Sequence, residues 1–391
     1  MAASRLAARL FEPGPAAFVL LFAVDTLSRA TLAVVLPVVA LGALGNARNV
    51  SIAYTVAVCM VLAASQAIPV VVRRFGAHRV FVLAALMLLL VPPCLALANV
   101  GSVLAAIALR GLATAAGVTA LQLMIMAHTD RRDLSKIEPL RVFSSAGVWV
   151  AMPLVGIKLY EQIAPWAAYA VTIAFIVLLL VHLALLKAER GPPAGLPARF
   201  APLRNFRRYM AQPRLRLAYV LNMARESWWA LLIVYVPIYM VTAGMGADWG
   251  GYLVSACFGL LFATPLFGRL ARRIGMRPVI MGGFIVTGTA VLLGALATEW
   301  PVVFAACIIV AGIGAIALDS ISMVTFQRAV RARERPEMTV VFVTYRDTAV
   351  LVSTGIYSLL LSFFGLWSVF AAAGLCLLAA AWLARHIPRG M

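Results

Sequence analysis

Long apolar runs recur along this sequence, and they constrain its fold more than any other feature. Most of them reach the roughly 20 residues that an α-helix needs to cross a hydrocarbon core of about 30 Å. Hydrophobic residues make up 64% of the 391 residues and charged residues only 12%, against roughly 45–50% apolar and about 25% charged in soluble domains. The runs lack the strict alternation of a transmembrane β-barrel. The sequence therefore predicts an all-α membrane protein.

The apolar runs predict twelve transmembrane helices in two sets of six. In the first half we expect spans near residues 16–41, 50–72, 80–98, 102–127, 142–160 and 166–186. In the second half we expect spans near residues 217–243, 249–270, 278–297, 301–326, 339–363 and 366–384. The resulting domains are an N-terminal six-helix bundle at 1–186, a linker rich in arginine, glycine and proline at 187–216, and a C-terminal six-helix bundle at 217–391.

The basic residues predict how the chain is oriented in the bilayer. If both termini are cytoplasmic, 27 of the 33 lysines and arginines fall in inner loops or at inner helix ends. Only Arg48 and Lys158 fall on the outer side. This distribution follows the positive-inside rule and places the linker in the cytoplasm. The net charge of +19 therefore reflects topology and does not point to nucleic acid. We expect a multi-pass protein of a bacterial inner membrane, working as a monomer.

Two sequence landmarks indicate that the halves are copies of one unit. A short basic turn, Arg73 to Gly76, recurs 199 residues later as Arg272 to Gly275. Pro37, near the outer end of the first span, matches Pro237 at an offset of 200. Two halves with the same topology are related by an axis along the membrane normal. The sequence thus predicts two pseudo-symmetric bundles.

The basic turns resemble the loop signature G-x-x-x-D-R-x-G-R-R of the major facilitator superfamily (MFS), and the resemblance covers essentially the whole chain. The chain departs from this signature at Arg73 and Arg272, which replace its acidic residue, and at Pro69, which replaces its first glycine. In the family the acid helps to latch the cytoplasmic side closed. The resemblance implies conformational gating by the positions that match the signature, which are Arg74, Gly76, Gly268, Arg273, Gly275 and Arg277.

Two further segments resemble motifs of the same family. Arg110 and the residues that follow it in the fourth span are similar to an arginine motif associated with proton coupling. The fifth span carries Gly147 and the stretch 151–156, which are similar to a glycine- and proline-rich segment common in exporters. The resemblance therefore implies a proton-linked cycle and slightly favours export.

Eight charged residues lie inside predicted spans, where each costs at least about 2.5–3.5 kcal/mol to insert. They are four arginines and four carboxylates: Asp25, Arg29, Arg110, Arg225, Glu226, Asp319, Arg346 and Asp347. The balance indicates a mutually neutralised network. By resemblance to the family, spans 1, 4, 7 and 10 line a central cavity, and their six charged residues point into it. The alternative for any of these residues is an ion pair that only holds helices together.

The residue types suggest two roles within this set. A carboxylate in low dielectric resists ionisation unless a cation is close, so a moving arginine can make it bind or release a proton. We expect proton coupling by Asp25, Arg110, Glu226 and Asp319. Arginines offer paired donors to a carboxylate or another anion, and aromatic residues suit an apolar group. We expect substrate binding by Arg29, Tyr54, Arg225, Trp229 and Arg346.

These features predict a secondary active transporter of a small organic solute, working by alternating access and coupled to protons. One alternative is an importer of an organic anion or of a metal chelate such as a siderophore. Another is a membrane sensor or assembly protein on the same scaffold that transports nothing. The sequence has no G-x-x-x-x-G-K-[ST] loop, no serine–histidine–acid set and no metal-ligand cluster. We therefore expect no enzyme activity, no cofactor and no nucleic acid partner.

Overall fold

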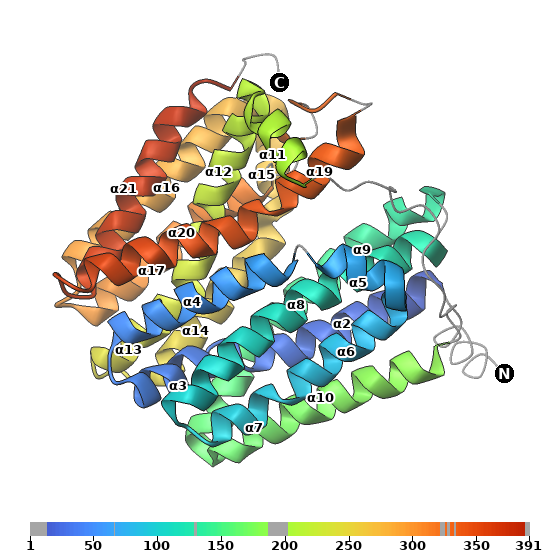
Figure 1. The fold of residues 1–391 in the computed structure, drawn as a ribbon. Helices are drawn as coiled ribbons and strands as arrows, with labels where there is room; N and C mark the ends of the chain where they lie inside the picture. The colour runs from blue at the N-terminus through green and yellow to red at the C-terminus, as the bar shows by residue number, and fades with distance from the viewer. Residues whose placement is uncertain are drawn as a thin grey trace. The chain divides into compact units, whose positions relative to one another are not determined.

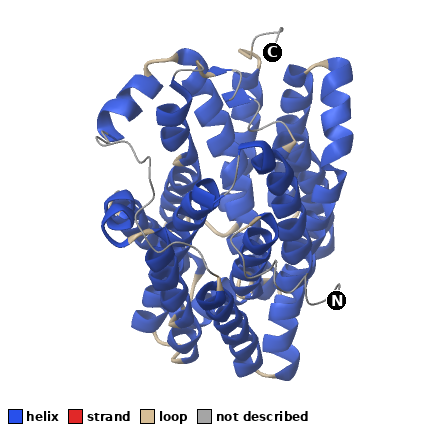
Figure 2. Ribbon diagram, turned by 90° about the vertical axis from the view of Figure 1, so that its right-hand side faces the viewer, coloured by secondary structure: helices blue, strands red, loops and turns tan. Residues whose placement is uncertain are grey.

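A computed structural model describes residues 14–65, 67–128, 131–186, 202–320, 325–326, 329–331 and 334–387. Throughout these ranges the chain is helical and has no strand (Figure 2). Within the described residues, ten helical stretches are long and apolar enough to cross a membrane, and some of them consist of two or more consecutive helices. The chain divides into two compact units. Unit 1 comprises Met1–Asn46 and Val56–Pro197, and unit 2 comprises Ala47–Thr55 and Ala198–Met391.

Unit 1 is built from the helices that cover the first half of the chain (Figure 1). They are α2 (Pro15–Thr31), α3 (Val35–Leu44), the second half of α4 (Ala47–Ser65), α5 (Ile68–Phe75), α6 (Ala77–Leu89), α7 (Val91–Ala96), α8 (Val100–His128), α9 (Arg131–Lys158), the π-helix η1 (Leu159–Ile163) and α10 (Pro165–Leu185). Several begin with a proline in their first turn, where the missing N–H has no helical partner to lose.

Unit 2 contains the start of α4 and all the later helices. They are α11 (Pro202–Met210), α12 (Pro213–Ala230), the π-helix η2 (Leu231–Tyr235), α13 (Val236–Thr242), α14 (Ala247–Gly259), the 3₁₀-helix η3 (Leu260–Ala263), α15 (Thr264–Ile274), α16 (Met276–Leu296), α17 (Pro301–Asp319), α19 (Arg335–Val343), α20 (Tyr345–Leu360) and α21 (Trp367–Ala384). Of these, α11 falls within the range predicted as linker.

The first predicted span is broken rather than continuous. Helix α2 ends at Thr31 and α3 begins at Val35. Pro37 explains the break, because it has no N–H to donate to the carbonyl of Ala33 and its ring crowds that carbonyl. The break is also seen at the amide of Ala33. In a regular α-helix this amide would bond the carbonyl of Arg29, four residues back. Here it bonds the carbonyl of Ala30, three residues back, at 3.1 Å. The helix therefore tightens and stops close to the middle of the span.

The matching proline in unit 2 also disturbs its helix, but in a different way. Pro237 lies just after η2, where the chain widens to π-helical geometry between α12 and α13. Pro237 has no N–H to donate to the carbonyl of Ile233, which lies inside η2. A π-turn inserts a residue without ending the helix. The two equivalent prolines thus give a break in unit 1 and a bulge in unit 2.

The predicted seventh and eleventh spans form helices, although neither is among the ten long apolar ones. The seventh consists of α12, η2 and α13, and α12 carries two arginines near its start and the Arg225–Glu226 pair. The eleventh is divided at Thr344 into α19 and the 16-residue α20. Charge lowers the mean hydropathy of the seventh span, and the division leaves two helices in the eleventh that are each shorter than a full span, so the prediction of twelve spans is consistent with ten apolar ones.

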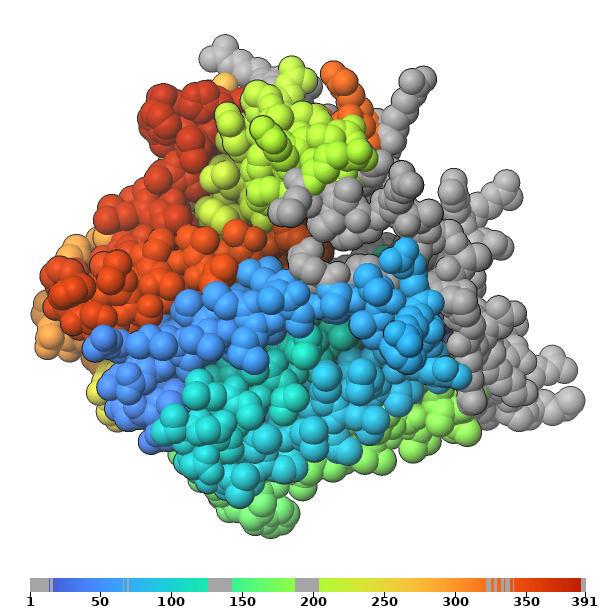
Figure 3. All heavy atoms as spheres, viewed as in Figure 1, coloured from blue at the N-terminus to red at the C-terminus, as the bar shows by residue number. Residues whose placement is uncertain are grey.

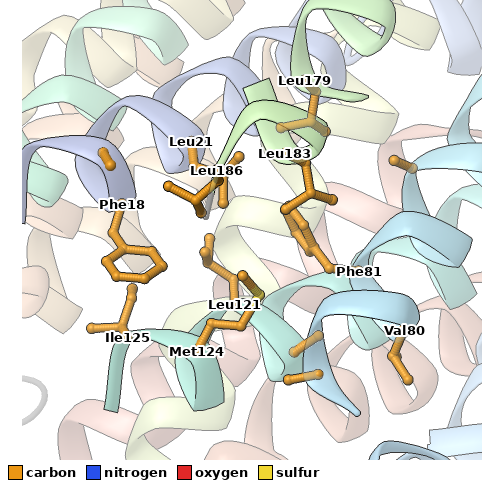
Figure 4. Close-up of a cluster of buried hydrophobic side chains, with 14 of the residues drawn as sticks. Phe18, Leu21, Val80, Phe81, Leu121, Met124, Ile125, Leu179, Leu183 and Leu186 are labelled. Atoms are coloured by element: carbon orange, nitrogen blue, oxygen red, sulfur yellow. The ribbon is translucent and has the colours of Figure 1, made fainter. Parts of the chain in front are cut away.

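The core of unit 1 lies where α2, α6, α8 and α10 meet (Figure 4). Phe18 from α2 and Phe81 from α6 are buried, with 0% and 1% of their surface exposed. In Figure 4, Phe18 lies beside Ile125 and Phe81 lies beside Leu183. The spheres of α6, α7 and α8 form a continuous face of this unit in Figure 3. Apolar side-chain packing holds these helices together, and His182 of α10 adds a polar contact at 3.3 Å to the Ala17 carbonyl of α2.

Glycines set the helix packing in unit 2. A Cβ on Gly314 of α17 would lie 2.5 Å from the Thr287 hydroxyl and 2.7 Å from the Gly283 carbonyl of α16. On the other side of α16, a Cβ on Gly374 of α21 would lie 2.9 Å from the Gly288 carbonyl. Small residues let transmembrane backbones approach closely and gain van der Waals contact. Helix α16 thus packs closely against both α17 and α21, and Figure 1 shows α21 beside it.

The two basic turns have almost the same backbone geometry. Gly76 connects α5 and α6 with φ 85° and ψ 152°, and Gly275 connects α15 and α16 with φ 93° and ψ 159°. This region of backbone space is open to glycine and strained for other residues. Each glycine amide bonds a carbonyl four residues back, at 2.8 Å in unit 1 and 3.0 Å in unit 2. The repeated sequence motif therefore has the same backbone conformation in both units.

Candidate functional site

Asp25 and Arg29 form an ion pair inside unit 1. Both lie on α2, one turn apart, and Arg29 Nη2 donates to Asp25 Oδ2 at 2.6 Å. Their side chains are 6% and 13% exposed, respectively. The i,i+4 spacing brings the two groups together on one face of the helix. The Arg29 guanidinium pairs with the Asp25 carboxylate within a spanning helix, where an unpaired charge would be costly.

Arg110 of α8 binds the backbone at the break in the first span. Its Nη2 donates to the carbonyl of Arg29 at 2.8 Å, and its Nη1 donates to the carbonyl of Leu32 at 3.2 Å. In a continuous helix the Arg29 carbonyl would accept from the amide of Ala33, which is bonded to Ala30 instead. The guanidinium therefore caps the C-terminal end of α2, where a positive charge also interacts favourably with the helix dipole. Arg110 and Asp25 thus both contact Arg29.

Arg225 is the centre of the polar cluster in unit 2. Its Nη1 forms an ion pair with Asp319 of α17, and its Nη2 donates to Glu226 Oε2 at 3.0 Å and to the Tyr345 hydroxyl at 2.9 Å. Arg225 is only 7% exposed. The cluster joins α12, α17 and α20. Both terminal nitrogens of the guanidinium are therefore occupied by protein groups.

Asp319 is held from a second side by an aromatic residue. Trp229, one helical turn after Arg225, donates its indole N–H to Asp319 Oδ2 at 3.0 Å. The Trp229 ring stacks on Phe258 of α14 with 4.7 Å between ring centroids. Each oxygen of the Asp319 carboxylate thus has a donor. Arg225 and Trp229 therefore hold the carboxylate from two directions.

Tyr345 connects the two arginines of this cluster. Its hydroxyl accepts from Arg225 and also from Arg346 Nε, the latter at 3.3 Å. The Arg346 side chain is exposed, and its guanidinium lies 5.9 Å from the Tyr345 ring centroid. Asp347 follows in the first turn of α20 and interacts electrostatically with Arg346 and Glu226. The sequence indicated no hydrogen-bonding role for Tyr345, which directly precedes the charged pair in an apolar run.

A hydroxyl cluster explains why Ala47–Thr55 groups with unit 2. Ser51 donates to the carbonyl of Thr354 at 2.9 Å, and its oxygen lies 2.6 Å from the Tyr235 hydroxyl. Thr55 donates to the hydroxyl of Thr354 at 3.0 Å. Sequence reasoning missed this contact, because serine and threonine in apolar helices usually bond their own backbone. The predicted binding residue Tyr54 lies in the same segment and interacts electrostatically with Tyr235.

The predicted gating residues lie at the basic turns. Arg74 is exposed and lies over the ring of Phe75, 5.6 Å from its centroid. Arg273 is exposed in the last turn of α15, where positive charge suits the helix C-terminus. Arg277 lines an open pocket of about 310 Å³ together with residues 274–276, Pro278 and Met281. Gly268 lies one turn before Arg272, with a Cβ position 3.9 Å from its Nη1.

Charged contacts also hold α11 against the rest of unit 2. Arg208 of α11 pairs with Glu334 at 3.2 Å, and Gln212 donates to the same carboxylate at 3.2 Å. Tyr209 is fully buried beside the ring of Tyr219. Burial raises the pKa of the Tyr209 hydroxyl, so it stays protonated at physiological pH. Helix α11 is therefore packed on unit 2. The predicted inner-loop residues Arg131, Arg132, Lys136, Arg141, Arg328 and Arg333 lie outside the described side chains.

The structure groups the predicted charged residues by unit. Asp25, Arg29 and Arg110 meet around the helix break of unit 1. Arg225, Glu226, Trp229, Asp319 and Arg346 share one cluster in unit 2. Among the described residues, no group of three or more histidines, cysteines or carboxylates has the arrangement of a metal site. The chemistry available in each cluster is therefore that of arginine and carboxylate.

Comparison with solved structures shows the same fold in known transporters. A peptide transporter POT in complex with sulfate aligns with a TM-score of 0.75 and 13% identity, over 95% of this chain and 93% of that one. A point mutant of the nucleoside transporter NupG aligns with a TM-score of 0.69 and 12% identity, over 95% and 98%. A bacterial homologue of the iron transporter ferroportin in its inward-facing state gives 0.67 and 14%, over 94% and 96%.

Sequence comparison is decisive at the level of the family. A search among curated proteins finds no sequence match. The sequence pattern of the Major Facilitator Superfamily, however, matches residues 18–263 and 251–390. The two matches together span nearly the whole chain. Long apolar helices, the repeated basic turn and the shared fold agree with this result. The chain belongs to the Major Facilitator Superfamily and is a multi-pass membrane transporter, not an enzyme.

Proposed function

We propose that this chain is a secondary active transporter that couples proton movement to the passage of a small organic solute. One observation carries the proposal: each unit holds an arginine–carboxylate pair within its spanning helices, Asp25–Arg29 in unit 1 and Arg225–Asp319 in unit 2. Charges at this depth are expensive to insert and are retained mainly along ion or substrate pathways. Packing alone would be served as well by apolar residues of similar volume.

Proton coupling follows from the chemistry of such pairs. A carboxylate beside a guanidinium stays ionised, and it binds a proton when the guanidinium moves away. Asp25 and Arg110 both contact Arg29, so a change in the helix break would alter the surroundings of the carboxylate. In unit 2, Glu226 and Asp319 share Arg225 in the same manner. These four residues, Asp25, Arg110, Glu226 and Asp319, form the proposed coupling set.

The solute is proposed to contact both charged and aromatic groups. Arg29, Arg225 and Arg346 supply donors for an anionic group, and Tyr54 and Trp229 supply apolar surface. Solved relatives named for peptides, nucleosides and metals support a small solute as cargo in this fold. Export is favoured by the glycine- and proline-rich part of α9, where Gly156 packs against the Thr31 carbonyl next to the helix break.

The remaining assignments complete the proposed transporter. We assign the N-terminal bundle to 1–186, the linker to 187–216 and the C-terminal bundle to 217–391, with both termini in the cytoplasm of a bacterial cell. The chain works as a monomer in the inner membrane by alternating access. The basic turns, with Arg74, Gly76, Gly268, Arg273, Gly275 and Arg277, control the inner side. Arginines at helix C-termini there take the place of the family's acidic latch residue.

Reconstitution tests this proposal directly. Purified protein in vesicles with an internal pH indicator is exposed to anionic, cationic and zwitterionic solutes. We expect a solute-dependent change in internal pH, and we expect Asp25→Asn to abolish it while the protein stays folded. Glu299→Gln, at an exposed carboxylate, is the matched control and should leave the change intact. Proton movement of normal size in Asp25→Asn would remove Asp25 from the coupling set. Solute movement without any pH change would refute proton coupling.

A further inference from the structure

The two arginines of the unit 2 cluster differ in how many of their hydrogen-bond donors are already used. Arg225 uses both terminal nitrogens on Asp319, Glu226 and Tyr345. Arg346 uses only Nε, in a 3.3 Å bond to the Tyr345 hydroxyl. Within the described part of the chain its two terminal nitrogens have no hydrogen-bond partner, and its side chain is exposed. Arg346 is therefore the guanidinium that can receive an anionic group without breaking an existing pair.

Two carboxylates beside Arg346 also have unused capacity. Glu226 accepts from Arg225 through Oε2, whereas its Oε1 has no hydrogen bond to any described residue. Asp347 forms no hydrogen bond or ion pair with the described residues, although it interacts electrostatically with Arg346 and Glu226. The Glu226 side chain is 22% exposed, and Asp347 is partly exposed. These carboxylates can accept hydrogen bonds from a cationic group.

The charges of these three groups define what complements them. Because Arg225 and Asp319 neutralise each other, one guanidinium and two carboxylates remain. An anion alone would meet Arg346 but also two like charges. A simple amine would meet the carboxylates but would leave the terminal nitrogens of Arg346 without a hydrogen bond. A ligand carrying both a carboxylate and an ammonium satisfies all three groups, and charge-assisted hydrogen bonds of this type are the strong ones.

We propose that Arg346, Glu226 and Asp347 form a binding site for the charged end of a zwitterionic, amino-acid-like solute. The solute carboxylate binds the terminal nitrogens of Arg346, and its ammonium binds the free oxygens of Glu226 and Asp347. This assignment rests on the proposed transport function and names the class of its substrate. With a neutral zwitterion bound, one negative charge remains in the cluster, and a proton carried with the solute neutralises it.

A purely structural role for the same residues makes different predictions. Asp347 lies in the first turn of α20, where a negative charge stabilises the helix N-terminus. Arg346 would then only offset that charge. Under this interpretation, substitutions at either position change thermal stability but leave ligand preference unchanged. The binding site requires that each substitution alter the preference for one particular charge on the ligand.

A six-carbon series of ligands separates these outcomes. Purified full-length protein is tested for binding of 2-aminohexanoate, hexanoate, hexylamine and 1-hexanol, which differ only in their charged groups. We expect 2-aminohexanoate to bind at least about tenfold more tightly than the two singly charged compounds, since each extra charged hydrogen bond contributes roughly 1.5 kcal/mol or more. Equal binding of all four, or tighter binding of one singly charged compound, overturns the zwitterionic assignment.

Two substitutions assign the charges to residues. Arg346→Gln should weaken 2-aminohexanoate about tenfold and bring it level with hexylamine, and Arg346→Lys should restore part of the difference. Asp347→Asn should instead bring 2-aminohexanoate level with hexanoate. Arg48→Gln and Glu299→Gln, at exposed positions, are the matched controls and should preserve the full preference. A preference that survives both site substitutions places the zwitterion elsewhere and overturns the site.

The same series in vesicles distinguishes failure of this site from failure of the proposed function. If hexanoate or hexylamine moves protons and 2-aminohexanoate does not, the transporter stands and the zwitterionic class is wrong. If 2-aminohexanoate binds with the expected preference but moves neither itself nor protons, the site stands and transport is refuted. Movement of 2-aminohexanoate with protons, lost in Arg346→Gln, supports both.

Discussion

The first span of unit 1 and its counterpart in unit 2 share a backbone plan and differ in charge. Pro37 and Pro237 lie 200 residues apart and both disturb their helices. At the same offset, Asp25 corresponds to Arg225 and Arg29 corresponds to Trp229. The carboxylate of one repeat is thus a guanidinium in the other. The repeats have kept the backbone feature and changed the chemistry beside it.

The change in charge also changes what each pair holds together. In unit 1 the Asp25–Arg29 pair closes on one helix, and Arg110 donates to backbone carbonyls at the end of α2. In unit 2 the Arg225–Asp319 pair joins α12 to α17. Among the eight charged residues within the predicted spans, unit 1 has one carboxylate and two arginines, whereas unit 2 has three carboxylates and two arginines. Within the spans, positive charge is therefore in excess in unit 1 and negative charge in unit 2.

The largest expected effect tests the pair that joins helices. Arg225→Gln leaves the mostly buried carboxylate of Asp319 without its guanidinium, and we expect the free energy of unfolding to fall by about 3–5 kcal/mol. Equilibrium unfolding in mixed micelles measures the loss. Arg208→Gln breaks a partly exposed pair and should cost about 1 kcal/mol or less. If Arg29→Gln costs as much as Arg225→Gln, the distinction between a pair within one helix and a pair between helices is wrong.

A smaller loss is expected at the helix break of unit 1. Arg110→Gln removes the charged donors from the carbonyls of Arg29 and Leu32, and it should cost about 1.5–3 kcal/mol in the same unfolding measurement. Lysine keeps the charge but lacks the planar guanidinium, so the stability of Arg110→Lys should lie between those of the parent and Arg110→Gln. Arg48→Gln, at an exposed position, should stay within about 0.5 kcal/mol of the parent. A neutral result for Arg110→Gln would show that the break needs no cap.

Helix packing by glycine gives a prediction for both units. Gly314→Ala places a Cβ 2.7 Å from the Gly283 carbonyl, and we expect a loss of about 1–3 kcal/mol in unfolding free energy. In unit 1, Gly156→Ala meets the Thr31 carbonyl and should cost at least as much. Gly282→Ala meets nothing within 4 Å and should be neutral or stabilising. Equal effects at positions 282 and 314 would contradict close backbone contact.

The smallest effect tests where the repeats agree. Gly76→Ala and Gly275→Ala each force alanine to a positive φ, near 85° and 93°. We expect roughly 1–2 kcal/mol of destabilisation at each turn, with nearly equal values. Gly268→Ala, on a helix with its nearest other atom at 3.9 Å, provides the control and should be stabilised or unchanged. Clearly unequal losses at the two turns would mean that their shared backbone conformation is not under the same constraint.

Sequence reasoning reached the class of fold and the repeat because both depend on local composition. Local sequence patterns are sufficient to identify apolar runs of membrane length, arginines concentrated on one side of the membrane and a repeated basic turn. For the cluster around Arg225, the sequence predicted which charged residues take part but not which of them bond to one another. Its bonds depend on α12, α17 and α20 meeting, which no local pattern states. The hydrogen-bonding role of Tyr345 could not be predicted for the same reason, since it comes from accepting hydrogen bonds from two arginines.

The sequence by itself determined that this chain crosses a membrane as repeated helices and that it carries charges at membrane depth. The cost of burying polar backbone and charge in lipid leaves few other solutions for such a composition. Only the tertiary structure decided which charges pair, which carbonyls Arg110 caps and which guanidinium keeps its terminal nitrogens open. Those outcomes depend on side chains from distant segments meeting within hydrogen-bond distance, and directional contacts of that kind arise only when the helices pack.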